Sequence, residues 1–349
     1  MGIGIDAEVL RRLPKVDLHI HFDGSVKPQT LLALAEEQGL KLPAGDADSL
    51  LPYMQVEGDC PSLADYLDKF NLVLPCLQTA AAMERTAFEV VEQAAQHHCK
   101  YIEVRIGPRL HQMKGLALDE VIGAFIAGLQ RGETQFGVKA RGIVICMRQH
   151  SVKDNLEVIE AAARFLGQGV VAADLAGPEA GYPPELHREV FALARSRGIP
   201  FTIHAGEAAG AGSISGAVTG LGASRIGHGV RLKEDKQLLE LVRKRRIPLE
   251  LCPVSNIQTK ASASWEAYPV REYFDQGLLL TVNTDNLTVS GTSMTKELTI
   301  LADKFQFTLP EICRVLLNGA EAAFLEEQEK RQMQKELARA YAAIEAGAE

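Results

Sequence analysis

The pattern of apolar and polar positions divides the chain into short, β-branched apolar runs that alternate with stretches of helical periodicity. Eight runs that end in polar or glycine-rich residues predict strands, at residues 15–21, 101–106, 141–147, 170–177, 200–207, 225–229, 248–256 and 278–286. Helical patterns fall between them, for example at 28–38, 80–98, 183–197 and 234–244. Because parallel strands need crossover helices and eight strands close a sheet, this order predicts an α/β fold of the (β/α)8 TIM-barrel type.

The main alternative fold is an open, doubly wound sheet, which normally has fewer strands and a phosphate-binding loop after its first strand. Here the first predicted strand ends in His-Ile-His-Phe-Asp-Gly instead. The segment 41–61, rich in Pro, Gly and Asp, predicts a long excursion that forms part of a lid, and 326–349 predicts an amphipathic outer helix. Since no linker, repeat or low-complexity tract divides the chain, we expect one domain over residues 1–349.

Polar side chains gather at the predicted strand ends, which line the active site in barrels of this type. A period of two places both histidines of the first strand on one face, and later strands end in a histidine or a carboxylate. Any one of these residues could be a buried structural histidine or a helix cap. Their coincidence favours a shared metal site built from His19, His21, His204, Glu207, His228 and Asp285.

Imidazole and carboxylate groups without a thiolate suit zinc, with iron or cobalt as chemically permissible substitutes. The expected ligands of one Zn²⁺ per chain are His19, His21, His204 and Asp285. Water bound to such a metal has its pKa lowered toward neutrality and is the expected nucleophile. His228, which is not needed as a ligand, is free to hold or to deprotonate that water.

Composition narrows the classes of partner. The net charge is -8 and the charges are spread along the chain, which argues against nucleic acid as a partner. Six scattered cysteines without a Cys-x-x-Cys pair suit a reducing cytosol, and we find neither a signal peptide nor a membrane span. We therefore expect a cytoplasmic protein that acts on a small molecule, with no obligate protein partner evident.

At these residues the sequence resembles the adenosine deaminase family, over nearly the whole chain. Seven motifs occur in the family's order, at 13–24, 101–105, 174–177, 204–207, 225–229, 252–256 and 283–285. The resemblance implies hydrolytic deamination of adenosine, and of 2′-deoxyadenosine, to the inosine product and ammonia. It also implies that the zinc ligands are those named above, that His228 and Asp285 activate the water, and that Glu207 protonates purine N1.

The resemblance further implies four substrate contacts. The backbone N–H of Gly177 would donate to purine N3, and His21 would touch the substrate as well as the metal. Asp23 would meet the ribose 5′-hydroxyl, whereas adenine deaminases usually carry Glu there; alternatively, Asp23 caps a turn before Gly24. Asn286 stands where many adenosine deaminases have an Asp that contacts N7, and it either meets N7 or only stabilises the turn.

Other functions remain open on the sequence. The chain could be a deaminase of adenine or of a modified adenine nucleoside or nucleotide, or a different metal-dependent amidohydrolase. The last class often adds a carboxylated lysine, and no predicted strand ends in a suitably placed lysine. Residues 62–70 and 77–79 resemble the lid of the nucleoside enzymes. A non-catalytic barrel would be expected to lack Glu207 or a metal ligand, and both are present.

Overall fold

A closed ring of parallel strands forms the centre of the molecule. The computed structural model describes residues 5–56, 60 and 62–346. Strands pair in parallel in the orders β1-β2-β3-β4 and β5-β6-β7-β8. Parallel bridges from Ala173 to Phe201 and from Ile20 to Asp285 join the two sets at both edges. The predicted barrel is therefore confirmed, with strands β1 (Lys15–His21), β2 (Cys99–Ile106), β3 (Lys139–Met147), β4 (Val170–Ala176), β5 (Thr202–Ala205), β6 (Arg225–His228), β7 (Leu249–Leu251) and β8 (Leu280–Val282).

The later strands are shorter than the sequence predicts. Residues 248–256 were expected to form one strand, but β7 ends at Leu251 and a helix begins at Pro253. Proline fits the first turn of a helix because its missing N–H would have no partner there, so the chain can turn at once. Residues 206–207 and 283–286 likewise lie beyond the ends of β5 and β8, although Asp285 still forms a bridge to Ile20 of β1. The side chains of Glu207, Asp285 and Asn286 line a cavity at the mouth of the barrel.

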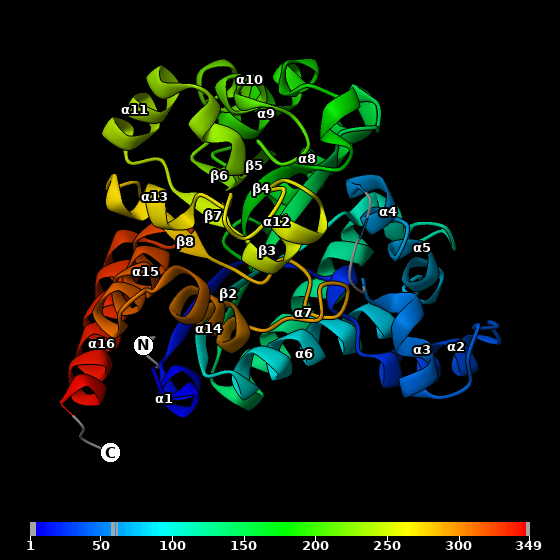
Figure 1. Cartoon of the computed structure of the whole chain (residues 1–349). Helices are drawn as coiled ribbons and strands as arrows, with labels where there is room; N and C mark the ends of the chain where they lie inside the picture. Colours follow the sequence, from blue (N-terminus) through cyan, green and yellow to red (C-terminus); the bar gives the residue numbers. More distant parts are fainter. Residues whose placement is uncertain (1–4, 57–59, 61, 347–349) are drawn as a thin grey trace.

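Helices surround the strands, as Figure 1 shows. The helix α2 matches its predicted bounds because Pro28 opens it and Gly39, with φ 65°, ends it in the left-handed conformation. The helices are α1 (Ala7–Arg12), α2 (Pro28–Gln38), α3 (Ala47–Met54), α4 (Leu63–Leu67), α5 (Phe70–Val73), α6 (Ala80–Gln96), α7 (Leu118–Phe136), α8 (Val152–Phe165), α9 (Arg188–Ser196), α10 (Ala211–Ser215), α11 (Lys236–Arg245), α12 (Pro253–Gln258), α13 (Val270–Asp275), α14 (Met294–Phe305), α15 (Leu309–Ala322) and α16 (Glu327–Glu345).

The excursion predicted at 41–61 contains a helix of its own, α3, and α2 to α5 gather on one side of the barrel, at the right of Figure 1. Its residues 57–59 and 61 lie outside the described part of the chain. The segment is fastened to the loop after β8: the Val56 N–H donates to the Val289 carbonyl at 2.8 Å, and the hydroxyls of Tyr66 and Ser290 are 2.6 Å apart. This connection brings α4 over the carboxyl ends of the strands.

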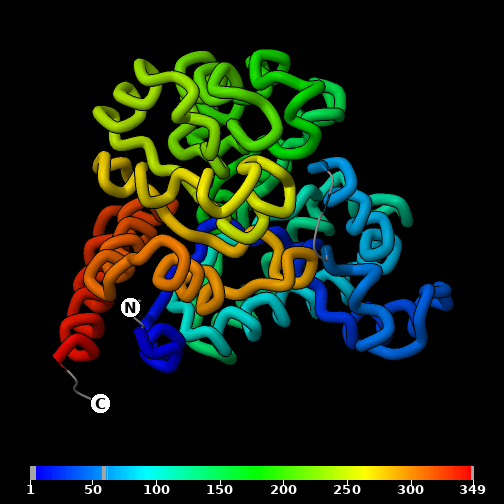
Figure 2. Tube along the Cα trace, in the orientation of Figure 1, coloured from blue at the N-terminus to red at the C-terminus, as the bar shows by residue number. Residues whose placement is uncertain are grey.

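The predicted outer helix near the C-terminus is α16, which lies on the same side of the molecule as α1 in Figure 2. Most residues of α16 are exposed, but Leu337 and Tyr341 are buried. The Tyr341 hydroxyl donates to the Pro14 carbonyl at 2.7 Å. Residues 347–349 of the predicted helix lie outside the described chain. Among the helices that the structure describes, none has the length and apolar character needed to cross a membrane.

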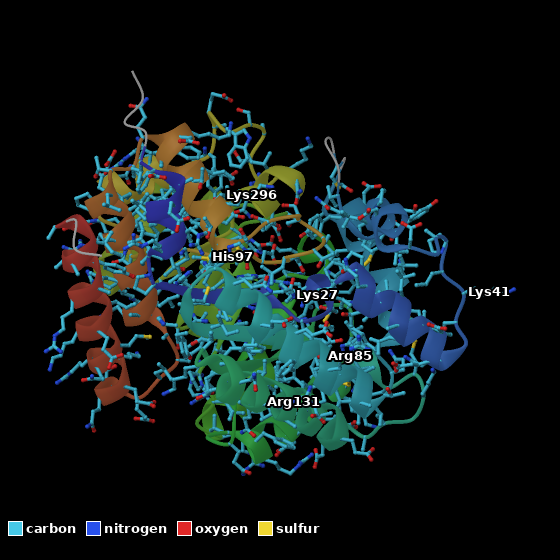
Figure 3. All side chains as sticks on the ribbon, turned by 90° about the horizontal axis from the view of Figure 1, so that it is seen from below. Lys27, Lys41, Arg85, His97, Arg131 and Lys296 are labelled. Atoms are coloured by element: carbon cyan, nitrogen blue, oxygen red, sulfur yellow. The ribbon has the colours of Figure 1, made fainter. Side chains whose placement is uncertain are left out.

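Three of the basic side chains labelled in Figure 3 have acidic neighbours. Lys27 pairs with Glu92, Arg85 pairs with Glu89 at 3.1 Å, and Arg131 pairs with Glu84 at 2.6 Å. These labelled cations are therefore neutralised locally by carboxylates.

Candidate active site

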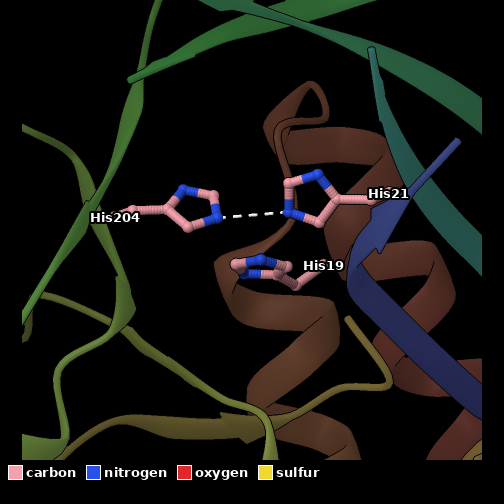
Figure 4. Close-up of side chains that lie close together, drawn as sticks. All are labelled: His19, His21 and His204. Carbon is pink, nitrogen blue, oxygen red and sulfur yellow. Dashed lines mark hydrogen bonds between the residues drawn. The ribbon is translucent and has the colours of Figure 1, made fainter. Parts of the chain in front are cut away.

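The carboxyl ends of the strands bring the predicted ligands to one point. His19 and His21 come from β1 and His204 from β5, and Figure 4 shows His21 and His204 facing each other. Their Nε2 atoms are 3.2 Å apart, and Asp285 Oδ1 lies 3.4 Å from His19 Nε2 and 3.3 Å from His21 Nε2. Two groups of residues could each hold a metal ion: one is His19, His21 and His204, and the other is His19, His228 and Asp285. Within each group the potential ligand atoms lie within 4.8 Å of one another.

The hydrogen bonds of two rings leave their Nε2 lone pairs directed at this point. Nδ1 of His19 lies 2.8 Å from Glu250 Oε2, and Nδ1 of His204 lies 3.0 Å from Asp174 Oδ2. A carboxylate accepts only, so each Nδ1 carries the proton, and in the neutral rings each Nε2 offers a lone pair. His19 Nε2 is buried without a hydrogen-bond partner. This carboxylate–histidine arrangement fits a divalent metal.

Arg105 connects the two supporting carboxylates. Its guanidinium donates to Asp174 at 2.8 Å and to Glu250 at 2.9 Å, and all three side chains are fully buried. Burial alone would raise the pKa of Asp174, but the interactions with His204 and with the charged Arg105 outweigh it and hold that pKa well below its usual range. No role was predicted for these three residues from the sequence. Arg105 and Asp174 do lie in the family motifs 101–105 and 174–177, and Glu250 lies on the predicted strand 248–256.

His228 is held in one tautomer by Asn256. The Asn256 amide nitrogen donates to His228 Nδ1 at 2.8 Å, while its Oδ1 accepts from the Cys252 N–H at 3.2 Å and the Tyr268 hydroxyl at 3.0 Å. These two donors fix the orientation of the amide, so the neutral imidazole carries its proton on Nε2. Burial lowers the pKa of His228 well below its usual value. Of the two expected roles, holding the water suits this ring better than deprotonating it.

Two of these residues adopt a backbone conformation that side chains rarely take. His228 and Asp285 both have φ 62°. Asp285 is pinned to β1 on both sides, because its N–H donates to the His19 carbonyl at 2.7 Å and its carbonyl accepts from the His21 N–H at 2.6 Å. Strained residues of this kind cluster at functional sites, where the surroundings hold them in place.

Glu207 follows β5 and faces the same cavity, with its Oε2 3.5 Å from His228 Nε2. Burial raises the pKa of Glu207 to about 8, and the negative charges of Asp285 and Glu179 add to the rise. A carboxyl group with this pKa is mostly protonated at neutral pH. Glu207 can therefore begin a reaction as an acid, which is the role expected of it.

The cavity has a volume of about 290 Å³, close to the lower end of small-molecule pockets, roughly 300 Å³. Residues from α4 and α5 cover it, as the likeness of 62–70 to a lid implied. The lining of the cavity includes most of the residues expected at the site: His21, Asp23, Gly177, His204, Glu207, His228, Asp285 and Asn286. Burial raises the pKa of Asp23 to about 6.

Glycine is required at two places near the cavity, at Gly177 in its lining and at Gly24 beside Asn286. Gly177 has φ 108°, and a Cβ there would lie 2.6 Å from Gln149 Oε1. A Cβ on Gly24 would lie 1.7 Å from Oδ1 of Asn286. This Oδ1 is buried without a described hydrogen-bond partner, so it packs against the main chain of Gly24. The amide nitrogen of Asn286 is then the polar atom left for the cavity.

Comparison with known proteins agrees with these features. The family model for adenosine deaminase matches residues 14–340. An adenosine deaminase of Clostridium kluyveri is 38% identical over 97% of each chain, and one of Enterococcus faecalis is 41% identical over 95% of this chain and 98% of its own. The chain belongs to the adenosine deaminase family. It is accordingly a hydrolase, and the resemblance noted in the sequence is confirmed.

Solved structures of related proteins share the fold. An adenine deaminase of Arthrobacter aurescens is 27% identical with a TM-score of 0.86, covering 94% of this chain and 98% of its own. An amidohydrolase of Burkholderia ambifaria with bound zinc has a TM-score of 0.90 at 22% identity, over 100% of this chain and 96% of its own. An N6-methyl-AMP deaminase of Arabidopsis has a TM-score of 0.85 at 24% identity, covering 95% of this chain and 99% of its own. The same barrel fold therefore occurs in proteins that act on different substrates.

Proposed function

We propose that this chain is a single-domain enzyme that hydrolyses adenosine and 2′-deoxyadenosine to the inosine products and ammonia, with one Zn²⁺ per chain. The observation that carries the proposal is the buried Glu207, with a pKa raised to about 8, next to the group of Nε2 and carboxylate ligands in a cavity of nucleoside size. The identity with adenosine deaminases of about 40% over the full chain supports it.

The residues divide the chemistry as follows. His19, His21, His204 and Asp285 would hold the zinc, which would supply Lewis acidity that makes water a nucleophile near neutral pH. The Asp285 carboxylate takes the proton of the attacking water, and Nε2–H of His228 donates a hydrogen bond that holds the oxygen. Glu207 gives its proton to N1, which withdraws electrons from C6, so that the oxygen adds there. Asp285 then passes the water proton to the C6 amine, the C–N bond breaks and ammonia leaves, while the proton of the new hydroxyl returns to Glu207.

The polarity of the cavity favours a nucleoside over a nucleotide. Among its described lining residues there is no Lys or Arg, and the two Asp that line it besides Asp285 are Asp23 and Asp68. Phosphate is bound in proteins by cations and N–H donors, so a 5′-phosphate would meet carboxylates in place of its usual partners. The same Asp23 can accept a hydrogen bond from a free 5′-hydroxyl.

We expect adenosine and 2′-deoxyadenosine to be turned over faster than adenine, AMP or N6-methyl-AMP. Ultraviolet spectroscopy of the five compounds side by side measures this directly, with release of ammonia, or of methylamine from N6-methyl-AMP, as the second readout. Faster turnover of adenine would assign the chain to free bases, and faster turnover of either nucleotide would contradict the argument from the cavity's charge.

Asp23→Ala tests the contact with the 5′-hydroxyl. Loss of a hydrogen-bond partner from a buried hydroxyl costs about 1–3 kcal/mol. The value of kcat/KM for adenosine should therefore fall by the factor that corresponds to this free energy. The matched substrate is 5′-deoxyadenosine, which lacks the hydroxyl and should lose little in the variant. Equal losses for the two substrates would reduce Asp23 to a residue that shapes the turn before Gly24.

Asn286→Asp tests the proposed contact with purine N7. An amide nitrogen donates to the N7 lone pair without any titration, whereas an Asp needs a proton between the two acceptors. The native chain should therefore prefer adenosine over 7-deazaadenosine, by about 0.5–1.5 kcal/mol in kcat/KM. The Asp variant should acquire a new pH dependence on adenosine. If the native chain treats the two substrates alike and the pH profile does not change, Asn286 only stabilises the turn.

A further inference from the structure

A second carboxylate, Glu179, holds the loop on which Glu207 stands. Glu179 lies after β4, its side chain is buried, and its Oε1 accepts the Gly206 N–H at 2.7 Å. Its Oε2 accepts three further N–H groups, from Glu207 at 3.0 Å, Ala208 at 2.7 Å and Ala209 at 2.9 Å. One carboxylate thus binds four consecutive N–H groups of the loop after β5.

The loop turns so that its N–H groups converge on Glu179. Gly206 has φ 75°, and the N–H groups of the four residues 206–209 point to one side because they share one acceptor group. Consecutive N–H groups that form such a concave nest are an anion site, and here the anion is a side chain of the protein itself. The position of Glu207 therefore depends on a residue 28 positions away in the sequence.

Glu179 also lies close in sequence to the part of the cavity that is expected to hold purine N3. Gly177, the residue expected at purine N3, lies two positions before Glu179, with Pro178 between them, and both Gly177 and Pro178 line the cavity. Glu179 consequently connects the end of β4, where the base is expected to rest, with the end of β5, where the acid stands. The charge of Glu179 also helps to keep Glu207 protonated.

We propose that Glu179 is a positioning residue, which fixes the loop 206–209 to the end of β4 so that Glu207 reaches N1 of a purine held at Gly177. This inference rests on the function proposed above. Nothing in it requires Glu179 to touch the substrate or the metal. Its effect on the rate must therefore pass through Glu207, and this is the property that an experiment can isolate.

The variants Glu179→Ala and Glu179→Gln remove the acceptor oxygens to different extents. Alanine leaves all four N–H groups without their acceptor, while glutamine keeps one oxygen and opposes the remaining N–H groups with its own donor. A misplacement of about 1 Å can cost on the order of a hundredfold in rate, so kcat should fall to that extent in the Ala variant and less in the Gln variant. Both should retain the metal.

Glu234→Gln is the matched control. Glu234 also accepts an N–H from this connection, that of Ala211 at 3.3 Å, but it lies about half exposed at the surface and outside the cavity lining. Its replacement should leave kcat within about twofold of the native value, since exposed polar contacts contribute little. An equal loss in this control and in Glu179→Gln would mean that any disturbance of the connection slows the enzyme.

A double-mutant cycle with Glu207→Gln separates positioning from a general structural role. If Glu179 acts through Glu207, Glu179→Gln should lower kcat strongly in the native background and by less than about twofold when Glu207 is already Gln. Equal losses in the two backgrounds would overturn the proposal. The Gln variant serves for the cycle even if the Ala variant does not fold, and its metal content and melting temperature are measured alongside.

Hydrogen exchange at the amides of 206–209 provides a readout that does not depend on turnover. The four amides should exchange faster in Glu179→Gln than in the native chain, with little change in Glu234→Gln. Unchanged exchange would overturn the inference. If the native chain failed to deaminate adenosine, the proposed function would be wrong, and the exchange rates would still decide whether Glu179 holds this loop.

Discussion

Replacing Glu207 by Gln should lower kcat on adenosine on the order of a hundredfold or more while the metal stays bound. General acid catalysis contributes a factor of this size, and the amide keeps the shape of the side chain without a transferable proton. Glu207 lies near His228 and not among the clustered ligand atoms, so its loss should not release the metal. The measurement is steady-state turnover together with metal content.

The pH dependence provides the matched test of the same residue. Burial, with the charges of Asp285 and Glu179, raises the pKa of Glu207 to about 8. The protonated form is the active one, so turnover should hold below that pH and fall as the pH rises through it. The Gln variant cannot lose this proton, and its profile should lack that descending limb. Near-normal turnover in the variant, or an unchanged limb, would remove Glu207 from the proposed mechanism.

Removal of the metal should have the largest effect of all. Chelation, or the change His19→Ala or Asp285→Ala, should abolish both metal binding and turnover, because the metal provides the nucleophile, whereas Glu207 makes C6 more reactive toward it by protonating N1. The native chain should contain roughly one equivalent, as catalytic zinc sites do. Activity of the chelated native chain should return with zinc, and cobalt is the informative substitute.

His97→Ala is the control for the ligand variants. His97 lies at the end of α6, and its Nδ1 is 3.0 Å from the Thr295 hydroxyl, away from the cavity lining. Its replacement should leave metal content and kcat near the native values. Full activity of a metal-free native preparation would falsify the metal site, whatever the variants do.

The barrel and its candidate metal ligands could be predicted from the sequence because both depend on local patterns. A period of two within one strand places His19 and His21 on the same face, and parallel strands bring their carboxyl ends to one edge. His204, Glu207, His228 and Asp285 each stand at such an end, so their meeting followed once eight strands had been counted. Strand ends were less accurate, as Pro253 shows, because helix and strand compete for the same apolar run.

The residues that support the site could not be found in this way. Asn256 fixes the tautomer of His228 only because Cys252 and Tyr268 orient its amide, and the contacts with His228 and Tyr268 join separate segments of the chain. The role of Glu179 could not be predicted from the sequence either, because the four N–H groups that donate to it lie far away along the chain. No spacing in the sequence encodes such contacts.

The sequence by itself determined which chemistry this protein can perform, because ligand types, their order and their places on strand ends are properties of residues and of short-range periodicity. The tertiary structure alone decided how each group is used: which nitrogen of an imidazole bears the proton, which carboxyl group stays protonated, and which amide end faces the cavity. These states depend on burial and on neighbouring donors and charges, and the surroundings of a buried group exist only once distant segments have packed together.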